Sequence, residues 1–245
     1  MGKLNAKKWL IIIVAILLVC FIGQYVIVTD SGKVRVEDTQ WVTDDGTSLH
    51  GKMYIPDSAD AQNPAPAVVT CHGFNNTVGD MENNNIELSR RGYVVISVDM
   101  AGHGSSSTAN GLMTNDDAVD GALDNNVGLD YEGDALVIDG GVYSALQYLG
   151  SLPYVDVESI GLIGHSGGAM AISAGAWRAL ANHETDSNVI IPNSIIVSCD
   201  GASRDYNEFS VNIGTITPEF DEFGPGHWNV EKPTQATTTA KMKQF

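Results

Sequence analysis

The sequence predicts an α/β fold in which a mostly parallel, doubly wound sheet follows an antiparallel hairpin and one transmembrane helix. Three features predict it: an apolar run near the amino terminus, two β-branched stretches around a tight turn, and a repeated alternation of strand-like and helix-like segments from residue 67 onward. Repeated strand and helix units build parallel sheets that are covered by helices. The 245 residues are enough for one such domain, which we expect over residues 29–245.

The first 28 residues differ from the rest of the chain. Lys3, Lys7 and Lys8 precede an apolar run that extends from Trp9 to Val28. As a helix this run would be roughly 30 Å long, the thickness of a hydrocarbon core. No Ala-x-Ala site follows, so we expect residues 1–28 to form a cytoplasmic stub and an uncleaved anchor, with a cleaved signal peptide as the alternative. The basic residues predict a cytoplasmic amino terminus and place residues 29–245 outside the cell membrane.

Acidic residues dominate the part of the chain that follows the anchor. The net charge is −17, and three of the 13 Lys and Arg residues precede the apolar run while none of the 30 acidic residues does. The remainder therefore carries a net charge of about −20, which repels phosphate backbones. We expect no nucleic-acid partner.

The strands and helices can be assigned in order along the chain. Residues 33–43 and 48–55 flank Asp44-Asp45-Gly46, which predicts an antiparallel hairpin. The apolar run over residues 67–71 predicts a strand covered on both faces. We then expect helices over residues 80–91, 135–149 and 167–182, and strands over residues 93–98, 159–163, 189–197 and 211–216. Residues 105–134, rich in Gly, Asn and Asp, predict either a lid or mouth insertion or a solvated surface loop.

One motif joins a predicted strand to a predicted helix. It reads Gly164-His165-Ser166-Gly167-Gly168. A serine on such a sharp turn is strained, and glycines two residues away on either side avoid collisions with the backbone, as in the nucleophile turns of hydrolases. The helix that begins here directs N–H groups and a positive dipole end at the same space. We therefore expect Ser166 to be the nucleophile and the Gly167 N–H to be an oxyanion donor, with an ordinary glycine-rich turn as the alternative.

A second motif, His72-Gly73-Phe74, directly follows the strand that ends at Cys71. Acyl-transfer enzymes of this topology supply their second oxyanion donor from this position, which predicts that donor to be the Phe74 N–H. The sequence has no glycine-rich dinucleotide or phosphate loop and no metal-ligand spacing. We expect a mechanism without cofactor or metal, acting on a small ester or peptide substrate.

With these motifs the chain resembles the α/β-hydrolase superfamily, especially its prolyl-oligopeptidase-type peptidases and dienelactone-hydrolase-like esterases. The likeness extends over residues 34–223 and includes Gly102-His103-Gly104-Ser105 after the strand that leads to Asp99. The resemblance implies a serine hydrolase that cleaves an ester or peptide-like acyl bond through an acyl-enzyme on Ser166. It also implies that His103 and His165 are structural residues.

The resemblance further implies an acid after a late strand and a histidine near the end of the domain. Asp221 follows the predicted strand over residues 211–216 and is the preferred acid, with Asp200 as the alternative. Only His183 and His227 follow Ser166: His183 ends the helix after the motif, and His227 comes too soon after Asp221 for a strand to separate them. We therefore expect the last strand, its catalytic histidine and the closing helix to be missing. The alternative function is a non-catalytic, membrane-tethered binding module or an inactive fragment.

Overall fold

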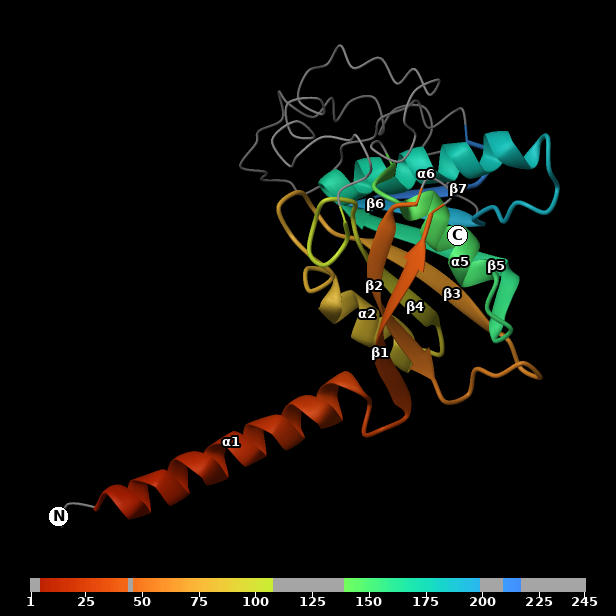
Figure 1. Cartoon of the computed structure of the whole chain (residues 1–245). Helices are drawn as coiled ribbons and strands as arrows, with labels where there is room; N and C mark the ends of the chain where they lie inside the picture. Colours follow the sequence, from red (N-terminus) through yellow and green to blue (C-terminus); the bar gives the residue numbers. More distant parts are fainter. Residues whose placement is uncertain (1–4, 44–45, 108–138, 199–208, 217–245) are drawn as a thin grey trace.

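The computed structural model of the protein describes residues 5–43, 46–107, 139–198 and 209–216. These residues form a seven-stranded sheet with the strand order β1-β2-β4-β3-β5-β6-β7 (Figure 1). The strands are β1 Val34–Val42, β2 Ser48–Pro56, β3 Ala65–Cys71, β4 Val94–Asp99, β5 Val155–His165, β6 Ser194–Ser198 and β7 Asn212–Ile216. The helices are α1 Ala6–Val28, α2 Glu82–Arg90, α5 Val142–Gly150 and α6 Gly167–His183.

The pairing of the strands confirms the predicted fold. β1 and β2 form an antiparallel hairpin, and β2 joins β4 in antiparallel register. β4, β3, β5, β6 and β7 then pair in parallel. The parallel strands all end at one edge of the sheet, so the segments that follow β3, β4 and β5 meet there.

Helices cover both faces of the sheet. Side chains alternate between the faces of a strand, so neighbouring residues of β4 pack in different cores. Val94 and Ile96 belong to the larger core with residues of α5 and α6, whereas Val95 packs with Ile86 of α2. β4 is buried at every position, as expected of a strand covered on both faces.

β6 is shorter than the strand predicted over residues 189–197, because it begins only at Ser194. The Gln147 side chain of α5 explains the difference. Its amide oxygen accepts from the Ile190 N–H at 2.9 Å, and its amide nitrogen donates to the Ile190 C=O at 2.8 Å. Both backbone groups of Ile190 are thus occupied by a side chain, which keeps them out of the sheet. The helix predicted over residues 135–149 begins as α5 at Val142, and residues 135–138 lie outside the described part.

Helix α1 extends away from the sheet (Figure 1). It has 23 residues, and none of them is buried against the body. Within the described part of the chain it is the one helix long and apolar enough to cross a membrane. Its length and composition fit a membrane span or a signal sequence, and the lack of any buried residue in it is unlike a core helix.

Candidate active site

Ser166 lies on a strained turn between β5 and α6. Its backbone angles are φ 52° and ψ −118°, a region that residues other than glycine rarely adopt. The Ser166 N–H donates to the Ser198 C=O at 2.9 Å, and its own C=O accepts from the Ala169 N–H at 2.9 Å. The turn is therefore held from both sides, and its geometry is that of a nucleophile elbow. The catalytic role of Ser166 remains a prediction.

Two glycines make the turn possible. A Cβ atom on Gly164 would lie 2.2 Å from the Gly168 carbonyl oxygen. A Cβ atom on Gly168 would lie 2.3 Å from the Cys71 carbonyl oxygen. Both neighbours are backbone atoms, which cannot rotate away as the end of a side chain can. The elbow and the end of β3 therefore pack at a distance that only glycine allows.

The loop after β3 packs directly against the elbow. A Cβ atom on Gly73 would lie 3.3 Å from the Ser166 Cβ, and one on Gly167 would overlap the Phe74 ring at 2.6 Å. Gly167 is the first residue of α6, so its N–H has no acceptor within the helix. None of the described residues accepts a hydrogen bond from the Phe74 N–H. The structure thus brings the two predicted oxyanion donors onto segments that touch at Ser166.

Asp80 connects this loop to the elbow. Its Oδ2 accepts from the Gly73 N–H at 3.1 Å and lies 3.5 Å from His165 Nδ1. The Gly73 N–H is therefore occupied, which leaves the Phe74 N–H as the donor available from this loop. No sequence motif marks Asp80 as a site residue, because its contacts depend on how the turn before α2 folds back onto β5.

His72 is held as a neutral ring. Its Nε2 accepts from the Met100 N–H at 3.1 Å, so the proton is on Nδ1, which donates to the Gly73 C=O at 2.7 Å. Burial lowers the pKa of His72, although the bonded Gly73 carbonyl opposes the shift. With both nitrogens occupied, this ring supports the loop and cannot accept a proton from Ser166.

The other described histidines have partners of their own. They are His50 with Asp99 at 2.8 Å, His103 with the Ala101 C=O at 3.2 Å, His165 with Asp80 at 3.5 Å, and His183 with the Val189 C=O at 2.7 Å. No hydrogen bond joins any of these five rings to Ser166. The sixth histidine, His227, lies outside the described residues, as do Asp221 and Asp200.

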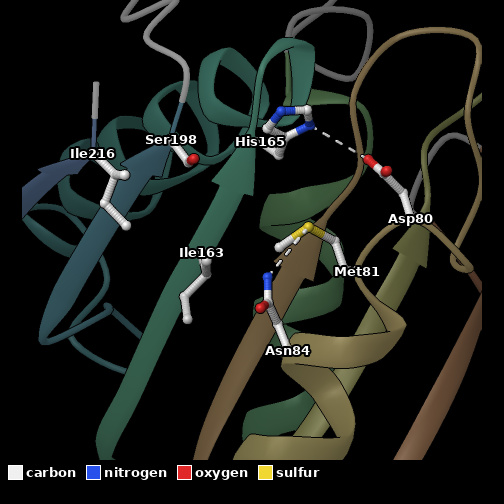
Figure 2. Close-up of a pocket in the computed structure, with 7 residues that line it drawn as sticks. All are labelled: Asp80, Met81, Asn84, Ile163, His165, Ser198 and Ile216. Carbon is white, nitrogen blue, oxygen red and sulfur yellow. Dashed lines mark hydrogen bonds and ion pairs between the residues drawn. The ribbon is translucent and has the colours of Figure 1, made fainter. Parts of the chain in front are cut away.

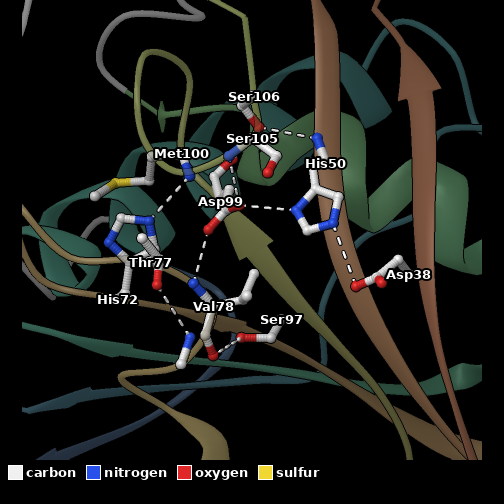
Figure 3. Close-up of polar contacts among 11 residues, drawn as sticks. Asp38, His50, His72, Thr77, Val78, Ser97, Asp99, Met100, Ser105 and Ser106 are labelled. Carbon is white, nitrogen blue, oxygen red and sulfur yellow. Dashed lines mark hydrogen bonds and ion pairs between the residues drawn. The ribbon is translucent and has the colours of Figure 1, made fainter.

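Asp99 connects three segments around the site (Figure 3). Its Oδ1 accepts from the Val78 N–H at 2.7 Å, and its Oδ2 accepts from the Ser105 N–H at 2.9 Å. The same Oδ2 lies 2.8 Å from His50 Nδ1 on β2. The carboxylate is buried, so these partners replace its lost hydration. It fixes the loops after β3 and β4 relative to the hairpin.

A pocket of about 270 Å³ opens beside the elbow (Figure 2). Its lining residues come from the start of α2 and the ends of β5, β6 and β7: Asp80, Met81, Asn84, Ile163, His165, Ser198 and Ile216. The pocket borders the elbow through His165 and Ser198 and not through Ser166 itself. Among the described residues no cluster of His, Cys, Asp and Glu is arranged to hold a metal ion.

Comparison with known proteins identifies the family. The model of the acetyl xylan esterase (AXE1) family matches residues 27–208. Acetyl xylan esterase 1 from Thermoanaerobacterium sp. JW/SL YS485 is similar in fold, with 15% identity, a TM-score of 0.51, and coverage of 82% of this chain and 83% of that one. No curated protein matches the sequence.

Other solved structures are similar over a smaller share of their length. DcsB, in complex with its substrate analogue, is 17% identical with a TM-score of 0.46, and the match covers 67% of this chain and 45% of DcsB. A prolyl endopeptidase is 17% identical with a TM-score of 0.46, and the match covers 68% of this chain and 21% of that protein. The chain thus spans less than half the length of both proteins. On the family match over residues 27–208, the protein belongs to the acetyl xylan esterase family of serine hydrolases, within the α/β-hydrolase superfamily.

Proposed function

We propose that the protein is an esterase that cleaves a small acyl ester through an acyl-enzyme on Ser166. The observation that carries the proposal is the strained turn at Ser166, with the Gly73-Phe74 loop packed against it. Family membership favours an ester over a peptide as the substrate.

In the proposed reaction, Ser166 Oγ attacks the ester carbonyl carbon and forms a tetrahedral intermediate. The Phe74 and Gly167 N–H groups donate to the oxygen that becomes negative. The serine proton passes to a base and then to the leaving alcohol as the ester C–O bond breaks. Water then attacks the acyl-enzyme and releases the carboxylic acid and Ser166.

The acid and the base of this reaction are proposals from the sequence. We propose Asp221 as the acid, with Asp200 as the alternative. The five described histidines all have partners away from Ser166. A base from these 245 residues would therefore be His227, whose short separation from Asp221 departs from the order that the superfamily resemblance implies. Ser166 without a base would be a weak nucleophile.

The lack of a bond between Ser166 and any of the five described histidines supports a second candidate function. If no base reaches Ser166, the protein would be a non-catalytic, membrane-tethered binding module. Such a module would keep the pocket and the oxyanion donors, and it would bind esters without turning them over.

Hydrolysis of p-nitrophenyl acetate and acetylated xylan by the full chain separates the two functions. We expect the wild type to hydrolyse both, the Ser166→Ala variant to lose at least about 1000-fold in kcat/KM, and the matched control Ser58→Ala to retain full activity. Ser58 is an exposed serine in the loop after β2. Loss of activity in His227→Ala would assign the base. A wild type no more active than Ser166→Ala would instead support the binding module.

A further inference from the structure

Gly167 is a glycine that the geometry of the elbow does not require. The side chains excluded at Gly164 and Gly168 would meet backbone atoms, whereas a Cβ atom on Gly167 would first meet the Phe74 ring, 2.6 Å from Cδ2 and 2.8 Å from Cε2. Gly167 does not have a positive φ, so alanine can adopt its backbone angles. The Phe74 ring therefore fills the space that a side chain at position 167 would occupy, directly after the nucleophile.

The Phe74 ring is held in this place by its neighbours. The ring of His103 lies on another side of it, with 6.4 Å between the centroids and 34° between the planes. His103 packs in turn against the His72 ring at 5.2 Å, and both histidines are buried. Phe74 itself is half-buried and packs against the larger core. The ring is thus clamped between His103 and Gly167, and part of it stays exposed beside the elbow.

The sheet gives Ser166 two different sides. β5, which leads to Ser166, lies between β3 and β6. On the β3 side, a Cβ atom on Gly73 would lie 3.3 Å from the Ser166 Cβ. On the β6 side, the Ser198 C=O accepts from the Ser166 N–H at 2.9 Å. The Phe74 ring belongs to the β3 side.

The proposed reaction uses these two sides differently. The candidate acids, Asp200 and Asp221, follow β6 and β7 in the sequence, so a base held by either approaches Ser166 from the β6 side. This base gives its proton to the alcohol that leaves. The alcohol part of the ester therefore lies on the β6 side, and the acyl group, which stays on Ser166, extends toward β3 and the Phe74 ring.

We propose that the Phe74 side chain is the wall that limits the length of the acyl group, and that residue 167 is glycine to make room for this wall. The inference rests on the proposed esterase function. Phe74 then has two separate roles, since its N–H binds the oxyanion while its ring determines specificity. Replacing the ring removes the wall and keeps the N–H, so a smaller residue at position 74 admits longer acyl chains.

A double-mutant cycle in the full chain tests the contact between the ring and Gly167 without any need for catalysis. Gly167→Ala should lower the urea midpoint of the wild type by about 0.5–1 M, because the new Cβ atom overlaps the ring. In a Phe74→Ala background the same substitution should lower it by less than half as much. The matched control is Gly79→Ala, where a Cβ atom would meet nothing closer than Thr77 Oγ1 at 3.7 Å and should not lower the midpoint. Equal shifts in the two backgrounds would overturn the proposed fit of ring and glycine.

Hydrolysis of p-nitrophenyl acetate, butyrate and hexanoate tests the specificity. We expect Phe74→Ala to raise the ratio of kcat/KM for hexanoate to kcat/KM for acetate at least about 10-fold, and Phe74→Leu to raise it less. The control Tyr93→Ala removes another half-buried aromatic ring, in the residue before β4 at the opposite edge of the sheet, and should leave the ratio unchanged. An unchanged ratio in Phe74→Ala, or the same change in Tyr93→Ala, would overturn the proposal.

Alkylboronic acids read the same limit without turnover, because they add to a serine hydroxyl and place their alkyl chain where the acyl chain would lie. Calorimetry should show that Phe74→Ala strengthens binding of hexylboronic acid relative to methylboronic acid at least about 10-fold, and that Ser166→Ala binds neither. If no ester is cleaved but this shift is seen, the esterase function fails and the role of Phe74 stands. If esters are cleaved and neither ratio changes, the role of Phe74 fails and the esterase function stands. A wild type that neither cleaves the esters nor binds the boronic acids overturns both.

Discussion

Replacing Asp80 with alanine removes the contact that connects the oxyanion loop to the elbow. In the structure Asp80 Oδ2 accepts from the Gly73 N–H at 3.1 Å and lies 3.5 Å from His165 Nδ1. Without it, the Gly73 N–H loses its acceptor, and the next peptide, which carries the Phe74 N–H, is held only through the bond from His72 Nδ1 to its carbonyl. We expect a slower first step of catalysis, because one of the two oxyanion donors is then poorly placed.

The size of the effect follows from the kind of contact. A hydrogen bond to a charged group contributes about 1.5–3 kcal/mol, and partial solvent access at Asp80 favours the lower end. We therefore expect Asp80→Ala to lower the free energy of unfolding by about 1–2 kcal/mol. Complete loss of an oxyanion donor costs about 100- to 1000-fold in rate, so displacement of one donor should cost about 10- to 100-fold in kcat/KM. Asp80→Asn keeps an oxygen acceptor and should remain within about 3-fold of the wild type.

Hydrolysis of p-nitrophenyl acetate and urea unfolding measure the two effects separately. The rate at which a fluorophosphonate labels Ser166 gives a further readout, since it needs the nucleophile and the oxyanion donors but no turnover. An Asp80→Ala variant with wild-type kcat/KM and labelling rate would refute the reasoning. So would an Asp80→Asn variant as impaired as Asp80→Ala, because charge and not the hydrogen bond would then be responsible.

Three other substitutions probe the scaffold. Gly168→Ala places a Cβ atom 2.3 Å from the Cys71 carbonyl oxygen and 2.5 Å from that of His72; we expect a loss of about 1–3 kcal/mol in urea unfolding and slower labelling of the elbow, and an unchanged variant would show that the elbow is looser than described. Burial raises the pKa of Asp139 to about 6, although the Arg178 guanidinium at 3.0 Å opposes the shift. This value is above the unfolded pKa of about 3.9, so between about pH 4 and 6 the folded protein holds more protons at Asp139 than the unfolded chain does. The wild type should therefore lose up to about 3 kcal/mol relative to Asp139→Asn as the pH rises from 4 to 7, and a constant difference across that range would contradict the shift. Leu162→Ala creates a cavity at a fully buried position of β5 and should cost about 2–5 kcal/mol in urea unfolding; a loss under 1 kcal/mol would contradict tight packing there.

The fold could be predicted from the sequence because its strands carry strong local signals. The β-branched stretches around Asp44-Asp45-Gly46 predicted the hairpin that β1 and β2 form, and the apolar run over residues 67–71 predicted β3. The start of β6 could not be predicted in the same way. Its boundary depends on the Gln147 side chain, which lies 43 residues from Ile190 in the sequence. Local hydrophobicity contains no information about such a distant partner.

In the candidate site, too, the residues that belong to local motifs were predicted and those that act through distant segments were not. The strained turn at Ser166 and the loop at Phe74 were predicted from short motifs, because glycines at fixed spacing report backbone geometry directly. Asp80 and Asp99 were not predicted as site residues, since each acts through backbone N–H groups of other segments. The assignment of Asp221 as the acid, with Asp200 as the alternative, stays a prediction, as does the missing catalytic histidine, because residues 199–208 and 217–245 lie outside the described part of the chain.

The nucleophile itself can be tested by finding where a serine-directed reagent binds. The full chain is treated with a fluorophosphonate, digested and analysed by mass spectrometry. We predict one adduct, on the peptide that contains Ser166, and none on that peptide in a Ser166→Ala variant that retains the unfolding midpoint of the wild type. A correctly folded wild-type protein that gives no adduct on Ser166, or an adduct on another serine that survives Ser166→Ala, would contradict the assignment of the elbow as the catalytic centre.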